Sequence, residues 1–160
     1  MIELSSISEE ERKGFLRGCE SFTTMRSKSP VWLKPTIKML LLKIGDTAYE
    51  PELKIILTAA CKAKRYNLTG TQFGMSQKGF AHANRLTKQN NSIKRMRKLL
   101  PLMEGLGLLT YMKGFSIKGE ANKGCQSHLR FSLTFLDMLD KDKCVRFGMK
   151  REDIDLIEVV

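Results

Sequence analysis

The sequence predicts a mainly α-helical domain with a small β-hairpin. Two segments, 50–67 and 92–104, place apolar residues at helical spacing. Two shorter segments, 108–118 and 127–136, have strand-like composition and are separated by a turn-rich stretch. A chain of 160 residues with 42% hydrophobic residues can form one domain with a substantial core. We therefore expect a single domain over 1–160, with its core in about 30–135 and a C-terminal helix and tail in 136–160.

The first third of the chain is predicted to form a helix, a polar connection and a second helix. Ser8 precedes three glutamates, which is typical of a helix N-cap followed by an acidic first turn, and predicts a helix over 8–25. Residues 26–30 are a polar connection. The next segment, 31–45, is expected to be extended before Pro35 and then to form a buried helix ending at Gly45, with Trp32 anchored in the core.

The middle of the chain begins with a strong helix over 50–67. Pro51 occupies a first-turn position, and an apolar stripe predicts one core-facing side, formed by Leu53, Ile56, Leu57 and Ala60. Glycine-rich residues 67–79 are expected to form turns. A short helix is expected over 80–88 and a turn over 89–91.

The segment 92–104 predicts a helix with two unlike faces. Its apolar residues fall on one side of a helical projection, and its four cations, Lys94, Arg95, Arg97 and Lys98, fall on the other. Asn91 or Ser92 can cap its start. A cationic first turn opposes the helix dipole, so these charges are expected to serve a partner outside the fold. Pro101 should weaken or kink the helix near its end.

The C-terminal part predicts the hairpin strands, a connecting loop over 119–126 and a short helix over 135–143. The last ten residues, 151–160, alternate acidic and apolar side chains and are expected to form a strand or a packing tail. The sequence shows no internal repeat and no low-complexity segment.

The charge of the chain is unevenly distributed. The net charge is +11 and the pI is near 9.7, which favours acidic partners, with nucleic acid first and an anionic membrane second. Between Glu52 and Glu104 there are eleven lysines and arginines and no acid, so this interval accounts for the whole net charge. We expect these cations to share a single surface. The alternative is a merely basic, solvated exterior.

Targeting and cysteine patterns favour the cytoplasm. The N-terminal residues are acidic and lack the apolar core of a signal peptide, and no apolar stretch is long enough to span a membrane. The cysteines, at 19, 61, 125 and 144, are scattered and read as reduced thiols.

The helix 92–104, its Glu-Gly-Leu-Gly-Leu-Leu exit and the strands after it resemble the recognition helix and wing of winged helix-turn-helix domains. The resemblance covers roughly residues 50–135. It implies a first helix at 80–88, a turn at 89–91, the recognition helix at 92–104 and a hairpin at 107–134 whose loop, 119–126, is the wing. It also implies extra N-terminal helices outside the motif.

The resemblance implies binding to double-stranded DNA, with the recognition helix in the major groove. Arg95 and Arg97 could read guanine, and Gln89, Asn90 or Asn91 could read adenine. Lys94 and Lys98 suit phosphates, and the hairpin cations could follow the adjacent backbone or minor groove. The expected DNA-binding residues are Lys78, His82, Arg85, Lys88, Gln89, Asn90, Asn91, Ser92, Lys94, Arg95, Arg97, Lys98, Lys118, Lys123 and Arg130.

In layout the chain also looks like the N-terminal DNA-binding domain of RepA-type replication initiators of plasmids, phages and their satellites. This resemblance implies an origin-binding module, acting as a homodimer in the bacterial cytoplasm or nucleoid. A winged-helix transcriptional regulator is the alternative. A dimer contact could involve Leu102 and 106–109.

Enzymatic and other binding functions are weaker interpretations. Neither histidine belongs to a cluster of cysteines and acids at metal-ligand spacing, and the glycine-rich stretches at 74–79 and 105–107 lack the remaining residues of phosphate-binding motifs. We therefore expect no enzyme, metal or cofactor. An RNA-binding module, with aromatic residues stacking on bases, and a protein-interaction module remain open. The aromatic candidates are Tyr66, Phe73, Phe80, Tyr111 and Phe115.

Overall fold

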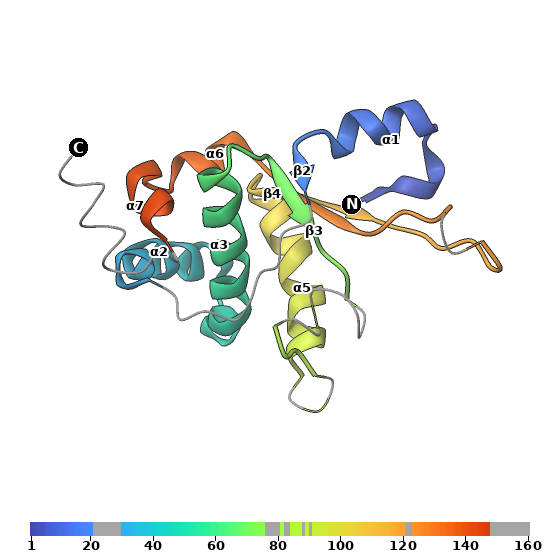
Figure 1. Ribbon diagram of the computed structural model, residues 1–160. Helices are drawn as coiled ribbons and strands as arrows, with labels where there is room; N and C mark the ends of the chain where they lie inside the picture. The colour runs from blue at the N-terminus through green and yellow to red at the C-terminus, as the bar shows by residue number, and fades with distance from the viewer. Residues whose placement is uncertain are drawn as a thin grey trace.

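A computed structural model describes residues 1–20, 30–75, 81, 84–87, 89, 91–120 and 123–147. Figure 1 shows helices gathered around a small central sheet, with a long hairpin projecting to one side. The prediction of a mainly helical domain with a small β element is confirmed at this level. No helix in the described part of the chain is long and apolar enough to cross a membrane.

Residues 31–44 form a 3₁₀ turn followed by an α-helix. A 3₁₀ turn, η2 (Val31–Leu33), leads into α2 (Lys34–Ile44), which ends where Gly45 takes a left-handed conformation. The expected helix end is therefore confirmed. The expected extended entry is wrong, because residues 31–33 already turn. Trp32 is partly buried against the core, as predicted.

Helix α3 (Glu50–Arg65) is the centre of the core. It follows the short 3₁₀ turn η3 (Thr47–Tyr49) and has Pro51 in its first turn. Its predicted stripe is buried, with Leu53, Ile56 and Leu57 fully inaccessible. Helices α2 and α5 (Ser92–Gly105) pack on it, together with the two short C-terminal helices α6 (Leu133–Asp137) and α7 (Lys141–Arg146). The sequence predicted one helix where α6 and α7 form two.

Within the described residues, the sheet has five strands in the order β1-β4-β5-β3-β2. They are β1 (Ile2–Glu3), β2 (Cys19–Glu20), β3 (Gly70–Gln72), β4 (Leu109–Lys113) and β5 (His128–Phe131). Strands β4 and β5 form the predicted antiparallel hairpin, and β3 pairs antiparallel with the other side of β5. The edge strands β1 and β2 pair parallel to β4 and β3.

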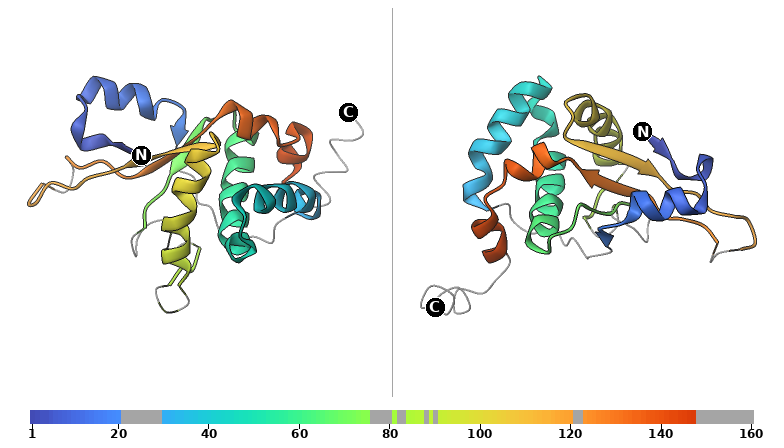
Figure 2. Two further views of the ribbon diagram at one scale, coloured as in Figure 1. Left: turned by 180° about the vertical axis from the view of Figure 1, so that it is seen from behind. Right: turned by 90° about the horizontal axis from the view of Figure 1, so that it is seen from above.

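The two faces of the sheet are covered by different parts of the chain. Leu129 and Phe131 of β5 point into the main core formed by α3 and α5. Met112 and His128 are buried on the other face, outside that core. The second face is covered by the N-terminal segment, which starts at one sheet edge in β1 and reaches the other edge in β2. Figure 1 and the left view of Figure 2 show its helix α1 (Glu9–Leu16) above the hairpin and α5 below it.

Three sequence predictions need correction. Ser8 caps α1 as predicted, accepting a hydrogen bond from the N–H of Glu11, but α1 (Glu9–Leu16) ends well before residue 25. Residues 67–79, expected to be rich in turns, also contain the strand β3, which the sequence did not predict. The helix expected over 80–88 does not continue through 84–87, where Asn84 and Arg85 form a turn and Arg85 has φ +54°.

The four cysteines form no disulfide. Cys61 of α3 and Cys144 of α7 are both fully buried and meet where these two helices pack. A hydrogen bond between the two thiols raises the pKa of Cys61, with burial adding to the effect. The same bond lowers the pKa of Cys144.

Candidate nucleic-acid interface

Helix α5 has the two unlike faces that its sequence predicts. Met96, Leu99, Leu100 and Met103 are buried in the main core. Lys94, Arg97 and Lys98 are exposed on the outer side, and we call these three residues the α5 cations. Within the described part of the chain no acid forms an ion pair with any of them. Helix α5 therefore presents three uncompensated positive charges.

Arg95 departs from the prediction. Its Nε donates to Oε1 of Glu52 at 2.8 Å, and the Glu52 side chain is 0% exposed. The ion pair joins the first turn of α3 to the first turn of α5. The Arg95 guanidinium is therefore engaged within the fold, unlike the three α5 cations, and its expected role in reading bases stays a prediction.

The start of α5 is also arranged differently from the prediction. Asn91 occupies the N-cap position in a left-handed conformation with φ +59°, and its side chain makes no capping hydrogen bond. Ser92 is buried, and its hydroxyl accepts a hydrogen bond from Arg95 at 3.4 Å. Ser92 is therefore not available to a groove, whereas Asn91 is exposed.

The α5 cations border a shallow hollow. Its lining consists of the three cations with Asn91 and Ile93, and it encloses about 440 Å³. Like charges three and four residues apart on a helix destabilise it by a few tenths of a kcal/mol per pair. The first turn of α5 has no acid to balance the positive end of the helix dipole. Both features cost stability within the chain and favour an anion bound from outside.

The hairpin, which follows α5 in the chain, carries further exposed lysines. Backbone hydrogen bonds between Phe115 and Cys125 extend the β4–β5 pairing towards the loop. Lys118 and Lys123 are exposed in that loop, and Lys123 lies 3.3 Å from Glu120 in a solvent-exposed pair. Side chains alternate along a strand, so Lys113 lies on the same face of β4 as Leu109, which is the face that packs towards α5.

Arg130 lies on the opposite face of the sheet. Its neighbours Leu129 and Phe131 point into the main core, so alternation directs Arg130 towards the face covered by the N-terminal segment. It is close enough to Cys19 of β2 to lower the pKa of that thiol, against the larger effect of burial, which raises it. Arg130 therefore lies on the face of the sheet away from α5, and its expected contact with the DNA backbone or minor groove stays a prediction.

The acid-free interval does not form a single surface. The Lys64 ammonium donates to the carbonyls of Leu136 and Leu139 at the end of α6, and Arg65 donates to the carbonyl of Phe147 at 2.6 Å. Lys54 pairs with Glu50 at 3.5 Å. Lys64 and Arg65 therefore hold the C-terminal helices and Lys54 is paired within α3, so the predicted shared surface reduces to α5 and its neighbours.

Some of the predicted DNA-binding residues belong to parts of the chain that the structure does not describe. Lys78, His82, Lys88 and Asn90 lie outside the described residues, as does the acidic tail. Arg85 and Gln89 are exposed in the segment before α5. Tyr111 packs edge-on against the fully buried Phe73, with ring centroids 6.1 Å apart, so these two aromatic rings serve the core instead of stacking on bases.

Two residues that matter here were missed by the sequence prediction. Glu52 directly precedes the acid-free interval, and its position in the first turn of α3 gives no sign that its partner is 43 residues away in α5. Lys113 sits at the end of β4, and the alternation of the strand could have placed it beside α5. Comparisons of the chain with protein-family models, with curated proteins and with solved structures gave no match.

Proposed function

We propose that this chain is a winged helix-turn-helix domain that binds double-stranded DNA. The observation that carries the proposal is the two-faced α5, whose apolar side is locked in the core while Lys94, Arg97 and Lys98 are exposed without acidic partners among the described residues. The major groove of B-DNA is about 12 Å wide and admits one α-helix. The hairpin that follows α5 directly takes the position of the wing.

The exposed residues suit different parts of a duplex. The compact charges of Lys94 and Lys98 suit phosphates, which fix the position of the protein without reading sequence. Arg97 follows Lys94 by three residues and directly precedes Lys98 in α5, and its planar guanidinium can donate two hydrogen bonds to guanine. Asn91 and Gln89 can pair with adenine at the entrance to α5. Lys113, Lys118 and Lys123 of the hairpin can reach the adjacent backbone.

The target that we propose within this class is a repeat at a replication origin. This part of the proposal rests on the resemblance in layout to RepA-type initiator domains. Selection of bound fragments from native genomic DNA tests it, because origin repeats would support an initiator. Enrichment of promoter operators would instead support a winged-helix transcriptional regulator.

Base reading by Arg97 gives the sharpest test of sequence specificity. The Arg97→Ala variant should lose about 1–3 kcal/mol of binding free energy on the selected site, and much less on unrelated duplexes. Equal weakening on all sequences would make Arg97 a phosphate contact. A chain that prefers single-stranded RNA over every duplex would overturn the proposal.

A homodimer is part of the same proposal. Leu102 and Leu106 are 42% and 40% exposed near the end of α5, where a second copy could cover them. Leu108 and Leu109, which the sequence analysis also considered for this contact, are buried in the core of the single chain. Sedimentation of the chain with a two-repeat duplex should show two copies bound, and Leu102→Glu with Leu106→Glu should reduce this to independent binding.

A further inference from the structure

Ile93 is the apolar member of the hollow beside the α5 cations. It lines that hollow together with Asn91, Lys94, Arg97 and Lys98. Its side chain is partly exposed, and among the described residues it is not one of those that pack against the main core. An aliphatic side chain therefore lies at the outer surface of α5, among groups that are otherwise polar or positively charged.

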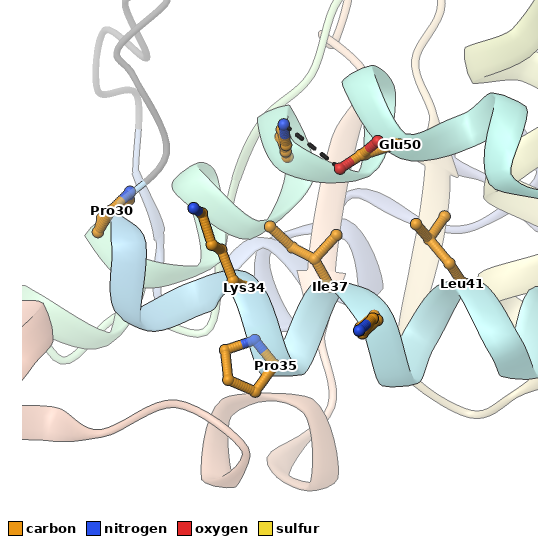
Figure 3. A pocket seen from close by; sticks show the side chains of 8 residues that line it. Pro30, Lys34, Pro35, Ile37, Leu41 and Glu50 are labelled. Atoms are coloured by element: carbon orange, nitrogen blue, oxygen red, sulfur yellow. Dashed lines mark ion pairs between the residues drawn. The ribbon is translucent and has the colours of Figure 1, made fainter.

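This hollow differs from the larger groove between α2 and α3, which encloses about 580 Å³. Figure 3 shows Ile37 and Leu41 of that groove pointing from α2 towards α3, and a dashed line marks the ion pair of Glu50 with Lys54. Its two aliphatic residues belong to the main core, and its lining includes an acid. The described lining of the α5 hollow has no acid, and Ile93 is not used by the core. The α5 hollow is therefore the better place for a polyanion that also offers an apolar group.

Ile93 and Arg97 lie one turn apart on the same side of α5. Four residues rise about 6 Å along a helix, and successive base pairs are about 3.4 Å apart. A helix that follows the major groove would therefore place these two side chains over base pairs about one or two steps apart. Ile93 is also the second residue of α5, and the N-terminal residues of a recognition helix are those that meet base edges.

The major groove offers an aliphatic side chain one favourable contact. Guanine, adenine and cytosine present hydrogen-bonding atoms there, whereas thymine adds a 5-methyl group. Isoleucine can neither donate nor accept a hydrogen bond. Covering a polar base edge with it would remove water without replacing the lost hydrogen bonds, which costs free energy. Covering the methyl group removes apolar surface from water, which stabilises the complex.

We propose that Ile93 contacts the 5-methyl group of a thymine about one or two base pairs from the guanine that Arg97 reads. This inference rests on the proposed binding of duplex DNA. It adds a second base to the specificity of α5, and it assigns that base to a residue without charge. The contact needs no phosphate, so it changes the preference among sequences and not the salt dependence.

Replacement of thymine by uracil in the selected duplex tests the contact. Uracil lacks only the methyl group and still pairs with adenine. The guanine is located first, as the position where Arg97→Ala no longer distinguishes the bases. One replacement next to it should then weaken binding by the parent chain about fourfold, which is the effect of exposing one buried methyl group. Ile93→Ala should bind the thymine and uracil duplexes about equally.

Leu42→Ala is the matched control, because Leu42 is an aliphatic residue of α2 that is 81% exposed and lies outside the α5 hollow. This variant should keep the full difference between thymine and uracil. Equal affinity of the parent chain for every uracil duplex would overturn the inference, and this readout does not depend on the folding of any variant. A difference that persists in Ile93→Ala would also overturn it. Both results leave the proposed function standing, whereas a chain that binds no duplex would overturn the proposed function together with this inference.

Discussion

The ion pair between Glu52 and Arg95 gives one of the four cations of α5 a structural role, because it connects α5 to α3. The carboxylate is fully buried, its Oε1 accepts from Arg95 at 2.8 Å, and its Oε2 has no hydrogen-bond partner among the residues that the structure describes. Removing the cation would leave a buried charge without compensation, which is far more costly than losing an exposed pair. The spacing of the four cations could not reveal this ion pair. Helical periodicity predicts the side of the helix on which a residue lies, but it does not identify the residue that it contacts.

Arg95→Ala should therefore lower the free energy of unfolding by about 3 kcal/mol. Arg97→Ala, a matched change two positions along the same helix, should stay within about 0.5 kcal/mol of the parent. Urea denaturation of both variants measures the difference. Equal stability of the two variants would mean that Arg95 is a solvated cation like its neighbours.

His128 makes stability depend on pH in a defined direction. Burial in the sheet lowers its pKa, and the hydrogen bond with the carbonyl of Gln126 only partly opposes this. The folded chain therefore binds a proton on this ring less readily than the unfolded chain, whose pKa is about 6.5. Its stabilising contribution is complete above that pH and is lost as the pH falls towards the lower folded value.

Thermal unfolding between pH 7.5 and 5 measures this contribution. The parent chain should lose stability on acidification, and His128→Gln should lose less over the same range. A steeper loss in the variant would place the titrating group elsewhere.

At the scale of elements, the helices were predictable because their signals are local. The caps at Ser8 and Gly45 and the stripes of α3 and α5 are all contained in neighbouring residues. The short strands β1, β2 and β3 were not predicted. Each has two or three residues and owes its conformation to a partner strand far away in the sequence.

Pro101 lies inside α5 and is exposed. Proline has no N–H to donate to the carbonyl of Arg97 one turn earlier, and its ring crowds that carbonyl. Pro101→Ala should raise the free energy of unfolding by about 1–3 kcal/mol. Chemical denaturation tests this, with Leu102→Ala as the neighbouring exposed control. A loss of stability would indicate that the proline ring makes a contact that α5 needs.

Gly114 fixes the course of the hairpin where it leaves the sheet. A Cβ atom there would lie 2.2 Å from the carbonyl oxygen of Cys125, which belongs to the opposite strand. Gly114→Ala should therefore distort the hairpin and weaken binding to duplex DNA. Gly105→Ala meets nothing within 4 Å and should leave affinity unchanged. Unchanged affinity in both variants would remove the hairpin from the proposed interface.

At the scale of the whole molecule, the acid-free interval divides into two roles. Lys64 and Arg65 of α3 hold the C-terminal part of the chain, whereas Lys94, Arg97 and Lys98 of α5 face outwards. Net charge and its position along the sequence pointed to a basic surface and to the helix that carries it. They could not separate structural cations from exposed ones, because that distinction depends on which carbonyls and carboxylates the fold brings near.

The salt dependence of duplex binding tests the central claim most directly. Each phosphate contact contributes about −0.9 to the slope of log affinity against log salt concentration. Lys94→Ala with Lys98→Ala should make the slope shallower by about 2. Lys43→Ala with Lys141→Ala removes the same charge from exposed positions on α2 and α7 and should leave the slope unchanged. Equal slopes for the two double variants would contradict the claim that α5 is the face that meets DNA.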